Sequence, residues 1–169
     1  VLCIGLASAA AIMVGNKIGA NEEDVAVDYS HKIGKVAPVL GLIIGVLVWL
    51  LAPQIVKPFN VEAGTFNDTV AVLRVMALIC PIRSYNVVMI VGIFRGGGDT
   101  LYSTLVQLGT VWFYAVPMAF LAAIVFKLPI TFVYLLICTE EFIKICFERR
   151  RLKSGKWIKN VIAENELAA

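Results

Sequence analysis

The sequence predicts an all-α membrane protein, a polytopic bundle of about five transmembrane helices. Hydrophobic residues make up 60% of its 169 residues and charged residues 16%, whereas soluble domains average about 45–50% apolar and about 25% charged residues. A mean hydropathy of +0.86 is too high for a soluble domain of this size, which needs a polar surface over most of its area. The natural solvent of this chain is therefore a lipid bilayer.

Five apolar segments, separated by charged, glycine-rich or proline-rich breaks, approach the roughly 20 residues that a membrane-spanning helix needs. The first is short, and we interpret it as a helix whose beginning is missing. The second carries no charge, the fourth has a central proline, and the fifth turns polar in its second half. We predict spans at residues 1–15, 36–56, 70–94, 101–126 and 129–147, within a helix bundle at 1–147, and a basic tail at 148–169.

The first segment contains small residues four positions apart, such as Ala7 and Ala11, a spacing that lets membrane helices pack closely. Gly15, Asn16 and Gly19 follow it. Glycine tolerates the left-handed conformation that ends many helices, so we expect the chain to turn sharply there.

Arg83 lies about midway along the third segment. An unpaired guanidinium at that depth costs several kcal/mol at least, so it should face protein or a water-filled cavity and have a partner. Pro81 precedes it and Asn86 follows one turn later, on the same helix face. A place on a substrate or ion pathway and a structural ion pair to Glu140 or Glu141 are both open readings.

Glu140 and Glu141 are the only acids deep enough in a span to relay protons, a role that needs a carboxyl whose pKa is raised by burial. The sequence does not say which of the two is buried, and Lys144 stands at i+4 to Glu140. In the fourth segment, Gln107 and Tyr114 share a helix face. These two side chains either line a cavity or hydrogen-bond between helices.

The turn Arg95–Thr100 joins two apolar spans through a few residues. Its glycines supply any positive φ that the reversal needs, and Asp99 is placed to cap the next helix. A phosphate-binding loop would need a preceding strand and a Lys-Ser/Thr pair. We therefore expect a structural hinge made of Arg95, Gly96, Gly97, Gly98, Asp99 and Thr100.

Basic residues are concentrated in alternate connections, with eleven on one side of the five spans and two on the other. By the positive-inside rule the C-terminus is cytoplasmic, and Trp157 is expected to anchor the tail at the membrane surface. A net charge of +3 with four scattered cysteines and one histidine suggests neither nucleic-acid binding nor a metal site. We expect no cofactor.

Three signatures in order resemble the multidrug and toxic compound extrusion (MATE) transporters. They are the stretch Val14–Ala20, the stretch Val91–Thr100 and the tail Arg151–Asn160. The resemblance implies a twelve-helix, two-lobe transporter, of which this chain looks like the C-terminal lobe without its first helix.

The resemblance further implies a transport protein rather than an enzyme, placed in a bacterial plasma membrane. The function expected is secondary active multidrug efflux, an antiport of cationic or amphipathic small molecules against H⁺ or Na⁺ by alternating access. Its partners would be the lipid bilayer and the N-terminal lobe. A flippase for lipid-linked polysaccharide precursors and a non-transporting fragment are the alternatives.

Overall fold

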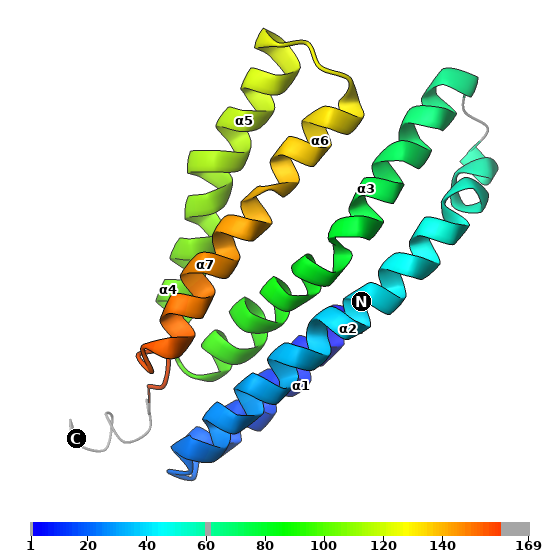
Figure 1. The fold of residues 1–169 in the computed structure, drawn as a ribbon. Coiled ribbons are helices and arrows are strands. Elements are labelled where there is room, and N and C mark those ends of the chain that lie inside the picture. The colour runs from blue at the N-terminus through cyan, green and yellow to red at the C-terminus, as the bar shows by residue number, and fades with distance from the viewer. Residues whose placement is uncertain (1, 60–61, 160–169) are drawn as a thin grey trace.

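A computed structural model describes residues 2–59 and 62–159 (Figure 1). Most of these residues are helical and none of them lies in a β-strand element, which confirms the all-α class. The elements are α1 Leu2–Gly19, α2 Glu23–Val56, η1 Lys57–Phe59, α3 Ala63–Val87, η2 Val88–Phe94, α4 Thr100–Thr110, η3 Val111–Ala115, α5 Val116–Phe120, η4 Leu121–Val125, α6 Ile130–Cys138 and α7 Glu140–Lys153. The elements η2, η3 and η4 are π-helical and η1 is a 3₁₀ turn.

Among the described residues, four helical segments are long and apolar enough to cross a membrane. They are Leu2–Gly19, Glu23–Phe59, Gly64–Phe94 and Thr100–Val125. The segment of the predicted fifth span is divided at Thr139 into two shorter helices, α6 and α7. The charged second half of that span gives α7 a polar face, which explains why it does not read as a continuous apolar helix.

The second helix is longer than predicted, because it begins at Glu23 rather than near residue 36. Glu23 and Asp24 lie in its first turn, where acidic side chains interact favourably with the helix dipole. The connection predicted over residues 16–35 shrinks to a short turn, and its left-handed residue is Asn21, with φ of 58°. The glycines expected to adopt that conformation, Gly15 and Gly19, are helical instead.

The connections alternate between the two ends of the bundle. The α1–α2 turn, the glycine-rich turn after η2 and the start of the segment after α7 lie at one end in Figure 1, and η1 and the η4–α6 connection lie at the other. This is the alternation that the basic residues require. The end holding the glycine-rich turn is therefore the one that the positive-inside rule predicts to be cytoplasmic.

The most completely buried element is η2, which packs across α1. Six of its seven residues are buried, and a Cβ at Gly92 would lie 2.9 Å from the Ala7 carbonyl oxygen. On α1 the buried face consists of Ala7, Ala10, Val14 and Ile18. The small side chains of the first helix therefore serve the close helix contact that their spacing predicts.

The outer faces of α2, α4 and α5 carry exposed leucine, isoleucine, valine and phenylalanine side chains, among them Leu50, Leu105 and Phe120. A soluble monomer exposes few contiguous apolar patches of this size. These faces are suited to contact with lipid or with further membrane helices.

The α2–α3 contact depends on Gly41. A Cβ at this position would lie 2.5 Å from Ser84 Oγ and 2.7 Å from the Cys80 carbonyl oxygen, and a backbone atom cannot move aside as a side chain can. We expect Gly41→Ala to overpack the contact and lower stability by roughly 1–3 kcal/mol. The measurement is the thermal unfolding midpoint of the purified transporter that contains this segment.

The matched control is Gly109→Ala in α4, because no atom lies within 4 Å of a Cβ at Gly109. An unchanged unfolding midpoint in Gly41→Ala, equal to that of the control, would contradict the close α2–α3 contact.

Candidate functional site

Helix α7 carries a buried face of charged residues. Glu140, Glu141, Lys144 and Glu148 are all buried, although ionisable side chains are rarely buried unless they are paired. Three of them, together with nearby polar side chains of other helices, form what we call the polar cluster. It consists of Arg83, Asn86, Gln107, Glu140, Glu141 and Lys144.

Lys144 lies at the centre of the polar cluster. Its Nζ is 2.8 Å from Glu140 Oε1 and 3.7 Å from Glu141 Oε2. Asn86 of α3 donates through Nδ2 to Glu141 Oε2 at 2.7 Å and to the Glu141 carbonyl oxygen at 2.9 Å. Both glutamates that the sequence singled out are therefore buried, and one lysine serves both.

A small cavity of about 110 Å³ opens beside the cluster, between α3, η2, α4 and α7. Arg83, Asn86 and Gln107 line it together with Glu141 and Lys144. The Arg83 side chain is exposed, and both candidate glutamate partners are paired with Lys144 instead.

Two polar atoms of the cluster have no hydrogen-bond partner among the described residues, namely Asn86 Oδ1 and Glu140 Oε2. A buried acceptor without a partner costs about 1–3 kcal/mol. Such atoms are candidates for binding a proton, an ion or a substrate group.

Tyr114, the other residue predicted on the polar face of the fourth segment, lies apart from Gln107. Its hydroxyl is 2.8 Å from Thr139 Oγ1, at the break between α6 and α7. It lines a separate, largely apolar pocket of about 500 Å³ that also includes Tyr102 and Thr110. The change from α-helical to π-helical geometry at Val111 alters the angular spacing on which a common face depends.

The predicted hinge at Arg95–Thr100 is clamped by the chain after α7. The Lys159 N–H donates to the Gly97 carbonyl oxygen at 2.8 Å, and Gly98 forms a β-bridge with Ile158. Arg151 Nε and Lys159 Nζ each lie 2.7 Å from the Asp99 carboxylate. We call this assembly the latch; it consists of Gly97, Gly98, Asp99, Arg151, Trp157, Ile158 and Lys159.

Two expectations about the latch residues are wrong. Trp157 is not a surface anchor, because only 1% of it is exposed and its ring packs against Phe94. Asp99 precedes α4 but forms no side-chain cap, since its carboxylate is held by Arg151 and Lys159. The glycines act in two ways: Gly98 has φ of 87°, and a Cβ at Gly97 would lie 2.5 Å from Trp157 Cε3.

The ion pairs of the latch set the protonation of Asp99. Burial alone would raise the pKa of this carboxyl, but the hydrogen bonds from Arg151 and Lys159 outweigh burial and hold the pKa below its usual value of 3.8. Asp99 is therefore ionised at neutral pH, which keeps the latch closed electrostatically.

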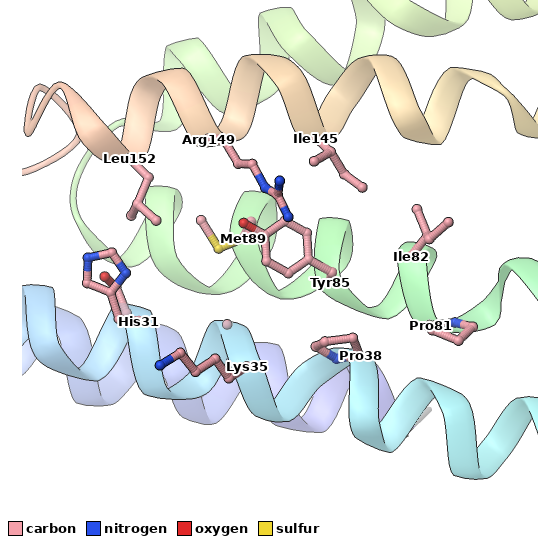
Figure 2. A pocket seen from close by; sticks show the side chains of 12 residues that line it. His31, Lys35, Pro38, Pro81, Ile82, Tyr85, Met89, Ile145, Arg149 and Leu152 are labelled. Carbon is pink, nitrogen blue, oxygen red and sulfur yellow. The ribbon is translucent and has the colours of Figure 1, made fainter.

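A larger pocket of about 490 Å³ lies between α2, α3 and α7 (Figure 2). Figure 2 shows His31 and Lys35 of α2 across from Arg149 of α7, with the Arg149 guanidinium beside the Tyr85 ring. Among the described residues, no carboxylate lines this pocket. Its polar lining is therefore cationic or neutral.

Sequence reasoning missed the central place of Lys144, the burial of Glu148 and the inward position of Trp157. The first two have a signal in the sequence, since Glu141, Lys144 and Glu148 follow i, i+3, i+7 spacing and share one helix face. Trp157 has none, because the contact that buries it is with a turn about 60 residues earlier in the chain.

Comparison with known proteins gives one family and one relative. The model of the MatE family matches residues 1–121. An uncharacterized transporter of Bacillus subtilis (strain 168), YisQ, is 24% identical over 153 residues, which cover 90% of this chain and 33% of the relative. The chain thus spans about a third of that relative's length. No solved structure gives a significant match.

We expect Lys144→Met to destabilise the protein by about 3–5 kcal/mol, because removing one partner leaves buried charge uncompensated. Adding Glu140→Gln should recover part of the loss. The measurement is the unfolding midpoint of the purified transporter.

The matched control for Lys144→Met is Lys32→Met. Lys32 Nζ forms the same i, i+4 pair with Asp28 at 2.6 Å, but both side chains are exposed, so no measurable change is expected. Equal midpoints for the two variants would show that the cluster is not buried as described.

We expect Asp99→Asn to open the latch at neutral pH and to expose Trp157, at a cost of about 1–3 kcal/mol. Acid should do the same to the native chain, because the contribution of a carboxyl with a lowered pKa is lost as pH falls through its folded value. Quenching of Trp157 fluorescence, in a background with Trp49 and Trp112 changed to Phe, reports the opening.

The control for this variant is Asp28→Asn, which removes an exposed ion pair. If the quencher reaches Trp157 no more readily in Asp99→Asn than in the control, the carboxylate has no role in closing the latch.

Proposed function

The chain belongs to the MatE family of membrane transporters, and from that premise we propose that it forms one lobe of a secondary active exporter. The exporter moves cationic or amphipathic small molecules out of the cell by antiport. This function is transport rather than catalysis.

The observation that carries this proposal is the polar cluster in the interior of the helix bundle. Ionisable residues at such positions are costly, and they mark ion and substrate pathways in membrane proteins. Here Glu140, Glu141 and Lys144 are buried together beside a small cavity. The unpartnered Glu140 Oε2 leaves one acceptor free to take a proton.

Of the two candidate coupling ions, the proton suits this cluster better than Na⁺. Lys144 Nζ already lies within 2.8 and 3.7 Å of the two carboxylates, in the position that a bound Na⁺ would need. A second cation there would be repelled by the ammonium group. Protonation of a carboxylate, by contrast, needs no additional space.

Alternating access requires that the lobe move relative to its partner lobe. The lobes of such transporters move largely as rigid bodies around a central site. The latch fixes the end that holds the glycine-rich turn, and in the proposed orientation this end is cytoplasmic, in a bacterial plasma membrane. The N-terminal lobe of the same transporter and the surrounding lipids are the proposed partners.

A flippase for lipid-linked precursors is the second candidate, and the pocket in Figure 2 favours it. That pocket holds His31, Lys35 and Arg149 with apolar residues such as Ile82 and Ile145. Basic side chains beside apolar ones suit an anionic head group and its acyl chain.

The test is transport by the whole transporter in proteoliposomes. We expect a pH gradient to drive uptake of a fluorescent organic cation, and Glu140→Gln to slow it at least tenfold, because the cluster then loses the carboxylate proposed to take the proton. Arg83→Ala should reduce transport more than expression if Arg83 lies on the pathway.

Asp28→Asn is the control for an unrelated acid. Transport driven by a Na⁺ gradient alone would contradict proton coupling. Movement of a fluorescent anionic lipid analogue, with no movement of the organic cation, would favour the flippase.

A further inference from the structure

Glu148 is a buried acid that the proposed transport cycle has not used. None of its surface is exposed, and neither carboxylate oxygen has a hydrogen-bond partner among the described residues. An ionised carboxylate in this environment would lose its hydration without compensation. Glu148 is therefore protonated in this conformation.

The groups that face Glu148 come from three helices. On α7 they are Glu141 and Lys144, on α3 Tyr85, and on α4 Tyr102. Of the neighbouring arginines of α7, Arg151 holds Asp99 and stacks on Tyr102, and Arg149 lies beside Tyr85 in the pocket of Figure 2. Arg150 is exposed.

The surroundings of Glu148 favour its protonated form. This residue follows the predicted end of the fifth span, at the start of the tail. Burial, and to a smaller extent the Glu141 carboxylate, raise its pKa to about 8, although Lys144 acts in the opposite direction.

The charge balance of the α7 face explains how Glu148 could change state. Three buried carboxyl groups, those of Glu140, Glu141 and Glu148, share one buried ammonium, Lys144. Lys144 stands four residues after Glu140 and four residues before Glu148, so its side chain has an i, i+4 partner in each direction. Only one of the two pairs is formed here, the one with Glu140.

We propose that Glu148 is a second proton-binding site of the lobe, which alternates with Glu140 for the ammonium of Lys144. In this structure Lys144 pairs with Glu140, and Glu148 holds the proton. In the alternative state the Lys144–Glu140 pair breaks and a Lys144–Glu148 pair forms. The O–H bond of Glu148 breaks, and the proton is bound by the free oxygen of Glu140.

The exchange conserves charge and protons along α7, since one carboxyl loses the proton that another gains. It carries the proton two helical turns, between the polar cluster and the end of α7 that bears the latch. The inference deepens the proposed function and rests on it for its role in transport. The existence of the proton site itself does not depend on transport.

Infrared spectroscopy of the full transporter in lipid tests the site directly. We expect the C=O stretch of a protonated carboxyl group without a hydrogen-bond partner at pH 6, and its loss with a midpoint near 8 as pH rises. Glu148→Gln should remove the band, and Glu148→Asp should keep a shifted one. Glu22→Gln, which changes an exposed acid, is the control and should leave it unchanged.

Stability gives a second readout. The contribution of a carboxyl with a raised folded pKa is complete below its unfolded value of 4.5 and is lost as pH rises to the folded value of about 8, so native stability should fall across this range. Glu148→Gln should abolish that fall and match the native chain only below the unfolded pKa of 4.5, where the carboxyl is protonated in both states. An infrared band that persists in Glu148→Gln would overturn the assignment of the proton to Glu148. So would a Glu148→Gln variant that is markedly less stable than the native chain at pH 6, if Glu148→Asp is as stable as the native chain.

Transport separates this inference from the proposed function. If a pH gradient drives transport, Glu148→Gln should slow it at least tenfold while equilibrium binding of the organic cation persists. Proton-driven transport with an unchanged rate and pH profile in Glu148→Gln would overturn the exchange and leave the proposed function standing. A titrating Glu148 band in a transporter that protons do not drive would refute the proposed coupling and support the proton site.

Discussion

A single ammonium group, Lys144 Nζ, balances the buried acids of α7, and the arrangement of the second half of the chain depends on it. Lys144 compensates the charge of Glu140 and Glu141 in the apolar bundle, and Asn86 donates a hydrogen bond to Glu141. The Asn86 contact also joins α7 to α3. Electrostatic balance and helix packing therefore act on the same residues, and changing the charge of one would change how the helices meet.

The first half of the bundle follows a different constraint, which is close backbone approach. Gly92 and Gly96 lie against Ala7 and Ala11 of α1 at distances that leave no room for a side chain. Lipid does not drive helices together as water does, so van der Waals contact of this kind contributes most of the association. The elements α1, α2, α3 and η2 therefore pack closely together, and α7 packs against α3.

The latch connects these two parts. The Asp99 carboxylate is held by α7 through Arg151 and by the following chain through Lys159, and Trp157 fills the space that Gly97 leaves. Helix α7 thus contributes residues to both assemblies, Lys144 to the polar cluster and Arg151 to the latch. The Asn86–Glu141 hydrogen bond and the Arg151–Asp99 pair both hold α7 to other elements, so a movement of α7 would change both contacts.

The sequence by itself determined the helical membrane fold, the alternating connections and the MATE resemblance, because hydropathy, basic-residue asymmetry and short motifs are local properties. It also placed Arg83 and Asn86 on one helix face, since helical periodicity within a segment fixes a common face; only the structure brings Gln107 of the next helix beside them. Only the tertiary structure decided the partners. Lys144 rather than Arg83 pairs with the glutamates, and Trp157 enters the core rather than the membrane surface. Such contacts join residues far apart in the chain, and helix packing, which no local pattern encodes, sets them.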